Sequence, residues 1–218
     1  MNRTILRTTL LGIFLMGFSY WGVAQTGEIN DGSFEGGTPN AAWNESSTNF
    51  GSPICNITMC GNGGGTSVPR TGNYWAWFGG VASLEIGSID QTITIPYGTA
   101  ELHFWLRNPV SSGSGNDYLQ VQIDDTPVWT VQEGNAAYSN YTEVVVDIST
   151  YANGQPHKIE FYSVCYGTGT TNFCVDDVSL TSGAPVPVSR LGILFVFLII
   201  GGFTFYRFTK SRSFILNN

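Results

Sequence analysis

An antiparallel β-sandwich is the fold that the sequence predicts for the central part of this chain of 218 residues. Apolar and polar residues alternate in ELHFWLR (101–107), YLQVQID (118–124) and EVVVDI (143–148), and a period of two is typical of half-buried strands. Gly, Asn and Pro residues separate these segments, and no segment shows the 3.6-residue period of an amphipathic helix. Many short strands joined by such turns are typical of a sandwich of two sheets.

The same alternation predicts which side chains point into the core, because successive residues of a strand face opposite sides of the sheet. QTITIP (91–96), HKIEFYSV (157–164) and CVDDVSL (174–180) extend the set of predicted strands. The expected inward-facing residues are Leu102, Phe104, Leu106, Leu119, Val121, Ile123, Val144, Val146, Ile148, Ile159 and Phe161.

The first 24 residues have the composition of a secretory signal peptide. Arg3 and Arg7 precede the apolar run LLGIFLMGF, and the small residues Val23 and Ala24 end the segment. A basic start, a short apolar run and a small-residue exit are the three parts of such a signal. A first transmembrane helix is the alternative, although the run is short for a span. We therefore expect export of a domain that begins at residue 25.

A second apolar run, residues 191–206, lies near the C-terminus, and Arg207, Lys210 and Arg212 follow it. At ~1.5 Å rise per residue this run forms a helix of roughly 24 Å, somewhat shorter than a bilayer core of ~30 Å. The segment PVPVS (185–189) precedes it. This order of parts resembles the PEP-CTERM-like sorting signals that exosortases process, with Pro-Val-Pro where the best-known motif has Pro-Glu-Pro.

Basic residues after the apolar run would stay in the cytoplasm, so the rest of the protein is expected outside it. The expected partners at this end are the export and sorting machinery and the membrane. A lasting single-pass anchor and a buried core helix are the alternatives to a processed sorting signal. The expected organisation is a signal peptide (1–24), a β-sandwich domain (25–182), a linker with the sorting motif (183–190), a transmembrane helix (191–206) and a basic tail (207–218).

The exported part is strongly acidic. All 16 acidic residues of the chain lie between Glu28 and Asp177, but only Arg70, Arg107 and Lys158 of the nine basic residues do, which gives this stretch a net charge of 3 − 16 = −13. Such a charge repels nucleic acid and anionic lipid, so nucleic-acid binding is excluded. It attracts cations such as calcium, although a solvating surface alone explains most of it.

Four cysteines, Cys55, Cys60, Cys165 and Cys174, are expected in an oxidising compartment, where disulfides form. Three pairings are possible. We favour two local bridges, one across CNITMC (55–60) and one across a hairpin at CYGTGTTNFC (165–174). Zinc binding is the alternative, but the chain has only two His and no CxxC spacing.

Three stretches carry a family resemblance: INDGSFEGG (29–37), RTGNYWAWFGG (70–80) and FCVDDVSL (173–180). In order and spacing they resemble the opening, middle and closing segments of jelly-roll modules of the galactose-binding-like and carbohydrate-binding-module class. Asp31-Gly32 stands here where Asn-Gly is usual. The resemblance implies a jelly-roll β-sandwich over nearly the whole exported part. It does not identify a ligand, because the fold has many functions.

The resemblance also implies a structural calcium ion where the first and last strands meet. Glu35 and Asp176 would be its carboxylate ligands, with backbone carbonyls near Asp31 and near Gly72 or Asn73. Ca²⁺ takes six to eight oxygen ligands, and carboxylates with carbonyls supply them. The alternative is that Glu35 and Asp176 are ordinary turn and edge residues.

No catalytic motif is visible in the exported part. It contains only two histidines, His103 and His157, and no G-x-S-x-G. Glycoside hydrolysis needs two carboxylates across a cleft, and no carboxylate stands in a recognisable motif. We therefore predict that the protein is not an enzyme.

The outward-facing residues predict a binding surface. One face is expected to collect indole, phenol, amide and guanidinium groups, and sugars bind to aromatic rings flanked by such polar groups. Cross-strand packing of these side chains is the alternative. We thus predict an exported, non-catalytic module that binds extracellular polysaccharide or surface matrix; a structural or adhesive coat protein is the rival. The candidate binding residues are His103, Trp105, Arg107, Tyr118, Gln120 and Gln122, with Lys158, Glu160 and Tyr162 beside them.

Overall fold

The computed structural model describes residues 27–183. The predicted signal peptide (1–24), transmembrane helix (191–206) and basic tail (207–218) lie outside these residues, as does all of the 183–190 linker after its first residue. Within residues 27–183, no helix is both long enough and apolar enough to cross a membrane.

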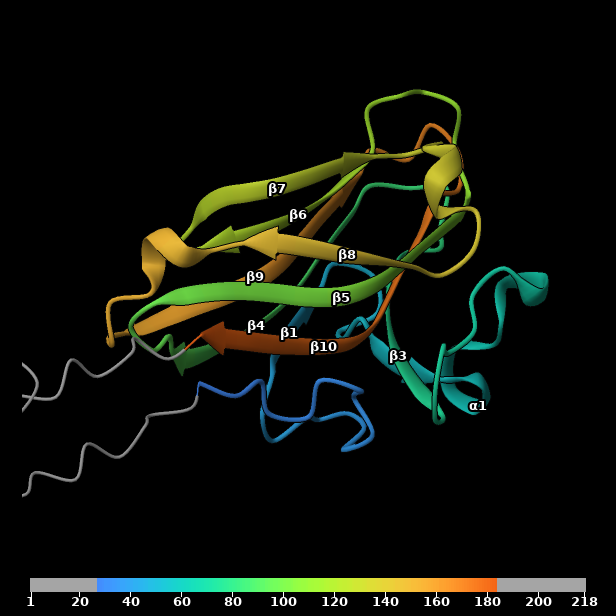
Figure 1. Ribbon diagram of the computed structural model, residues 1–218. Helices are drawn as coiled ribbons and strands as arrows, with labels where there is room; N and C mark the ends of the chain where they lie inside the picture. Colours follow the sequence, from blue (N-terminus) through green and yellow to red (C-terminus); the bar gives the residue numbers. More distant parts are fainter. Residues whose placement is uncertain (1–26, 184–218) are drawn as a thin grey trace, which may run out of the picture.

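Two five-stranded antiparallel sheets lie face to face (Figure 1), which confirms the predicted all-β sandwich. The chain passes repeatedly from one sheet to the other, as in a jelly roll. Sheet I contains, in spatial order, β1 (Asn44–Ser47), β4 (Glu85–Thr94), β9 (Pro156–Cys165), β6 (Tyr118–Ile123) and β7 (Thr126–Gln132). Sheet II contains β2 (Ile54–Asn56), β3 (Tyr74–Gly79), β10 (Asn172–Gly183), β5 (Thr99–Val110) and β8 (Thr142–Asp147). One short α-helix, α1 (Ile57–Cys60), follows β2, and the 3₁₀ turns η1 (Gly63–Gly65), η2 (Ala136–Tyr138) and η3 (Ser149–Tyr151) lie in connections.

The main core fills the space between the sheets, and every inward-facing residue that the alternation predicts is buried in it. Phe104 from sheet II meets Phe161 from sheet I edge to face, with ring centroids 5.0 Å apart, and Trp129 packs on Phe104 at 5.3 Å. Phe34 and Trp43 join this core from the segment before β1. That irregular segment therefore closes one side of the sandwich.

A second, smaller core lies on the outer face of sheet II. Trp75 and Cys174 are buried there together with Cys55, and Trp77 and Tyr141 pack against them. The Trp75 indole donates a hydrogen bond to the Ser67 hydroxyl (2.9 Å). The loop between α1 and β3 therefore covers part of this face.

Only one of the two predicted disulfides is present among residues 27–183. Cys55 and Cys60 form a disulfide with a Cα–Cα distance of 6.1 Å. The predicted bridge between Cys165 and Cys174 is wrong, because both are free and buried. Cys165 ends β9 in sheet I, whereas Cys174 lies in β10 of sheet II, so the intervening segment connects the two sheets and is not a hairpin. Burial raises the pKa of each thiol to about 12.

The two ends of the described chain lie at the same end of the sandwich, and α1 lies towards the opposite end (Figure 1). Gly27 fits so closely against Thr94 and Leu180 that a Cβ atom at this position would stand 3.0 Å from the Leu180 side chain. The first described residue is thus next to the last strand.

Candidate functional site

The predicted binding residues do not form one face, which corrects the prediction. His103, Trp105 and Arg107 lie on β5 in sheet II, whereas Tyr118, Gln120 and Gln122 lie on β6 in sheet I. Both groups point away from the core, but they do so on opposite sides of the molecule. Alternation in the sequence separates inward from outward residues, but it does not assign a strand to a sheet.

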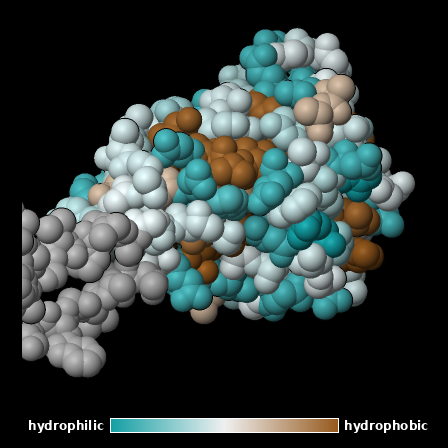
Figure 2. Space-filling view, in the orientation of Figure 1, coloured by the Kyte–Doolittle hydropathy of each residue, from teal (hydrophilic) through white to brown (hydrophobic). Residues whose placement is uncertain are grey.

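On β5, the outward side chains are occupied by neighbours. The Arg70 guanidinium lies 3.5 Å from the centroid of the Trp105 ring. His103 is hydrogen-bonded to Glu143 and Thr181, both at 3.1 Å. The face that includes β5 and β8 is mostly hydrophilic or neutral, with small hydrophobic patches (Figure 2). These residues therefore serve intramolecular packing, the alternative that the sequence had left open.

Arg107 reaches towards the loop that covers sheet II, where its Nη1 lies 3.5 Å from the Gly65 carbonyl oxygen. Its Nε is buried and has no hydrogen-bond partner among residues 27–183. Arg107 is therefore held under this loop and does not project from the face.

Sheet I presents a different outer surface, which we call the tyrosine–glutamine face. Strand register brings its side chains into two rows that run across the sheet. One row is Ser88, Tyr162, Gln120 and Thr130, and the other is Asp90, Glu160 and Gln122. Neighbouring strands are ~4.8 Å apart, so each row places hydrogen-bonding groups at short, regular intervals. The tyrosine–glutamine face comprises Ser88, Asp90, Tyr118, Gln120, Gln122, Thr130, Glu160 and Tyr162.

Phenol rings gather at one end of this face. The Tyr118 and Tyr162 rings have centroids 6.5 Å apart and are inclined by 45°. Burial, together with the nearby Tyr162 and Tyr166, raises the pKa of Tyr118 above its usual value. Tyr118 therefore stays neutral near pH 7 and can both donate and accept hydrogen bonds.

The polar groups of the face are held in position by one another. The Gln122 amide donates to the Gln120 amide oxygen at 3.0 Å. Lys158 donates to Glu160 at 2.9 Å and to Asp125 at 2.5 Å, and these bonds raise the pKa of the lysine. The amides of Gln120 and Gln122 are thus oriented, and the positive charge of Lys158, which lies next to the face, is paired with carboxylates.

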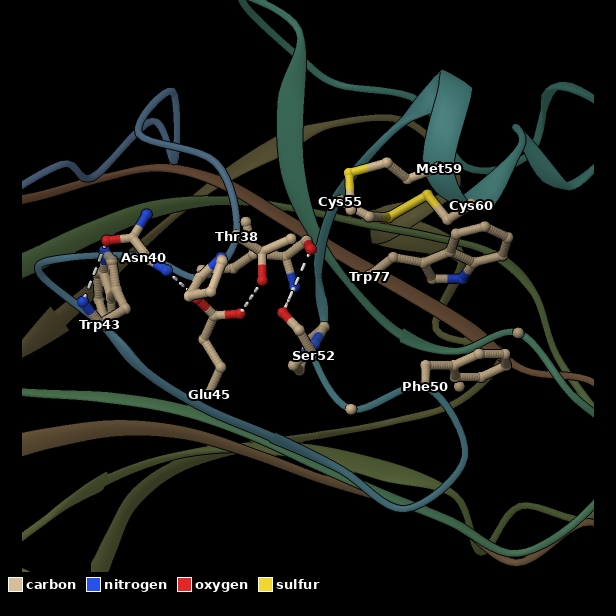
Figure 3. Close-up of a pocket in the computed structure, with 16 residues that line it drawn as sticks. Thr38, Asn40, Trp43, Glu45, Phe50, Ser52, Cys55, Met59, Cys60 and Trp77 are labelled. Atoms are coloured by element: carbon tan, nitrogen blue, oxygen red, sulfur yellow. Dashed lines mark hydrogen bonds between the residues drawn. A yellow bond between two sulfur atoms is a disulfide. The ribbon is translucent and has the colours of Figure 1, made fainter.

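A pocket of about 840 Å³ lies near α1 and was not anticipated from the sequence. Its walls include Glu45 from β1, Phe50 from the following loop, Met59 from α1 and Trp77 from β3 (Figure 3). Most of its lining comes from loops, which lack the periodicity that makes strand faces readable. No signal in the sequence marks it, because the exposure of Phe50 and Met59 is visible only in the structure.

The predicted calcium ligands are already engaged with backbone N–H groups. Glu35 accepts hydrogen bonds from Asn73 (2.7 Å) and Tyr74 (2.9 Å). Asp176 accepts from Arg70 (2.7 Å) and Thr71 (3.1 Å). Burial raises the pKa of Asp176 to about 7 against the effect of these bonds. Glu35 and Asp176 have the carboxylate oxygens that a cation needs, but these oxygens already accept hydrogen bonds from the backbone. The two residues therefore fit a cation only in part.

Asp31 accepts hydrogen bonds from the Gly36 N–H and from the Asn40 amide (2.7 Å). It fixes the turn that carries Glu35. Among residues 27–183, no cluster of three or more His, Cys, Asp or Glu side chains is arranged to hold a metal ion.

No family model and no curated protein matches the chain. Solved structures with a similar fold include TmCBM61 in complex with β-1,4-galactotriose, at 14% identity over 73% of this chain and 100% of that chain, with a TM-score of 0.49. The K1 cleaved adhesin domain of Lys-gingipain from Porphyromonas gingivalis W83 is 12% identical over 70% and 96% of the two chains (TM-score 0.47). The xylan-binding CBM22-1 domain of Paenibacillus barcinonensis Xyn10C is 12% identical over 75% and 100% (TM-score 0.46). At these values the likeness concerns the fold, and the function has to be inferred from the residues of this chain.

Proposed function

We propose that the protein is a non-catalytic carbohydrate-binding module whose tyrosine–glutamine face binds along a neutral polysaccharide chain. The observation that carries this proposal is the arrangement of Tyr118 and Tyr162 beside the oriented amides of Gln120 and Gln122. Aromatic rings bind the apolar faces of sugar rings, and amides bond to the hydroxyls. An open strand surface also accommodates a long ligand that continues past both edges.

A glycan array with the full chain tests this proposal. We expect selective binding to one class of neutral polysaccharide, and loss of that binding in Tyr162→Ala. Val145→Ala is the matched control, because Val145 is 49% exposed on the opposite face, in β8. An array without any specific signal would favour the rival function, a structural or adhesive coat protein.

Export and C-terminal processing form the second part of the proposal. The sequence of the two ends supports a signal peptide at 1–24 and a sorting signal whose helix at 191–206 is removed after export. The intact mass of protein recovered from its native cell surface tests this. Mature protein that still contains residues 203–212 would mean that the run is a lasting membrane anchor.

A structural calcium ion is the third part. Glu35 and Asp176 would hold the ion, because Ca²⁺ prefers carboxylate oxygens as ligands. Burial acts to raise the pKa of Glu35, but the hydrogen bonds from Tyr74 and Asn73 outweigh it and lower the pKa overall, so Glu35 is ionised near pH 7 and able to bind a cation. A bound cation would join the segment before β1 to the last strand.

A further inference from the structure

The pocket near α1 differs in shape from the tyrosine–glutamine face. Its walls come from β1 and the loop before it, the loop at 50–53, the start of β2, the helix α1 and the end of β3. A flat strand surface lets a long ligand continue in both directions, whereas a pocket with several walls can hold only the end of a long ligand. Its volume of about 840 Å³ is within the range of roughly 300–1,000 Å³ that is usual for small-molecule sites.

Apolar side chains with unusual exposure form one part of the lining. Phe50 is 61% exposed and Met59 is 58% exposed. In the view of Figure 3 the Phe50 and Trp77 rings lie on the same side of the pocket, and Glu45 and Thr38 lie on the other. The Trp77 indole N–H donates to Asn172 at 3.1 Å, which fixes the ring. Exposed apolar groups that border a pocket indicate a binding role more strongly than scattered ones.

Glu45 is the polar counterpart of this apolar wall. One carboxylate oxygen accepts a hydrogen bond from the Thr38 hydroxyl (2.6 Å), and the other accepts one from the Asn40 backbone N–H (2.5 Å). A carboxylate has about four acceptor positions, so each oxygen can accept a further hydrogen bond. Glu45 is therefore both fixed in place and able to bind donors such as ligand hydroxyls.

The charge of the lining restricts the ligand. Glu45 is the only Asp, Glu, Lys, Arg or His among the residues that line the pocket. A phosphate, sulfate or uronic acid group would meet no cation there and would be repelled by this carboxylate. The pocket thus favours a ligand without negative charge.

We propose that this pocket binds the terminal sugar of a neutral oligosaccharide. The apolar face of the sugar lies against Phe50 and Trp77, and its hydroxyls donate to Glu45. The proposal takes its ligand class from the proposed function, but it concerns a separate site, so either one can fail alone. The pocket would then hold the end of a sugar chain, and the tyrosine–glutamine face would hold its interior.

Met59 provides a direct readout of the pocket. The chain has three methionines, Met1, Met16 and Met59, so ¹³C-methyl-methionine labelling of the full chain gives a simple spectrum, in which Met59→Leu identifies the pocket signal. The probes are neutral gluco-, galacto-, manno- and xylo-oligosaccharides of one to four residues. We expect one series to shift the Met59 signal with saturation, monosaccharide included, at concentrations up to about 10 mM, which is the weak-binding range.

Variants then separate the pocket from the face. Phe50→Ala should weaken the Met59 response about tenfold, or ~1.4 kcal/mol. Ile57→Ala is the matched control, because Ile57 is 51% exposed on the same helix as Met59 but does not line the pocket. Tyr162→Ala should abolish polysaccharide binding by the face and leave the Met59 response intact.

Three outcomes would overturn the proposal. The first is that no oligosaccharide shifts the Met59 signal. The second is that Phe50→Ala and Ile57→Ala behave alike. The third is that only alkylammonium compounds shift it, which would make Glu45 the centre of a cation site. If Tyr162→Ala abolishes polysaccharide binding but no oligosaccharide shifts the Met59 signal, the pocket proposal alone is refuted. If oligosaccharides shift the Met59 signal but Tyr162→Ala still binds polysaccharide, only the role of the face is refuted.

Discussion

The guanidinium of Arg70 covers the indole of Trp105, with its Cζ 3.5 Å from the ring centroid. Arg70 is in turn fixed by Asp177, to which it donates a hydrogen bond of 2.5 Å. A covered ring cannot serve as a platform for a sugar, so the most conspicuous aromatic residue of the predicted face belongs to packing.

Trp105→Ala should therefore change stability and leave ligand binding intact. We expect a loss of about 1–2 kcal/mol, because the variant removes a cation–π contact of ~0.5–2 kcal/mol together with apolar packing. For a domain of this size that lowers the melting temperature by roughly 2–8 °C. A thermal melt and a glycan array on the same preparation measure both properties. Lost glycan binding with an unchanged melt would return Trp105 to the binding site.

Tyr162→Ala should show the opposite behaviour. Tyr162 lies on the partly exposed outer surface of sheet I, next to Tyr118, so its truncation leaves no cavity in the core. We expect a change of less than about 1 kcal/mol in the free energy of unfolding, and loss of polysaccharide binding in affinity electrophoresis. Tyr162→Phe, which keeps the ring, should retain most of the binding.

Glu133 predicts how stability depends on pH. Its carboxylate is buried and accepts hydrogen bonds from the hydroxyls of Ser111, Ser112 and Ser114. Burial alone would raise its pKa, but the hydroxyl bonds from these serines and from Thr171 outweigh burial, and the pKa lies well below its usual value.

A group whose pKa is lowered by folding stabilises the protein above its unfolded pKa, which is ~4.3 for Glu, and loses this contribution as the pH falls. Glu133→Gln should thus lower the urea midpoint at pH 7, and the gap to the unmodified protein should narrow towards about pH 3. If the two midpoints differ by the same amount at pH 7 and at about pH 3, the charge of Glu133 does not contribute to stability.

The buried cysteines give a prediction for chemical labelling. Cys165 and Cys174 are inaccessible, and burial raises the pKa of both to about 12, so almost no reactive thiolate is present at pH 7. Without a reductant, an alkylating reagent should add nothing to the native protein and two groups to the urea-unfolded protein. After reduction it should add four, because the Cys55–Cys60 disulfide then opens. An unfolded, unreduced protein that stays unlabelled would show that Cys165 and Cys174 are also in disulfides, against the structure.

The calcium hypothesis is tested by chelation. If the folded state alone binds the ion, calcium at ~100 times its Kd adds about 2.7 kcal/mol. We expect a chelator to lower the melting temperature, and Glu35→Ala to abolish this difference. Melting curves that coincide with and without chelator would leave Glu35 as a turn residue that accepts the N–H groups of Asn73 and Tyr74.

The strands and the core were readable from the sequence because they depend on local alternation. Leu102, Phe104 and Leu106 had to share one face whatever the topology, and all three are buried. Which strands are neighbours depends on contacts between distant parts of the chain. Tyr162 and Gln120 are opposite each other only because β9 pairs with β6, and no local pattern encodes that pairing.

The same limit explains the two errors about the cysteines and the binding face. CYGTGTTNFC has the length and the Gly-rich composition of a hairpin, but it joins β9 of sheet I to β10 of sheet II. Similarly, β5 and β6 are consecutive in the chain and belong to different sheets. The pocket could not be predicted, because most of its lining comes from loops and because only the folded chain brings its walls together.

The position of the last strand has a mechanical consequence. β10 lies in the interior of sheet II, hydrogen-bonded to β3 on one side and to β5 on the other, and its pairing with β5 extends to Gly183. Tension applied at Gly183 along the strand therefore loads the β5 ladder in shear over the whole length of β10, and the β3 ladder over Asn172–Val175 resists it as well. An edge strand such as β8 could instead be peeled away bond by bond. A protein tethered through this end would carry its load on a ladder that is sheared and not peeled.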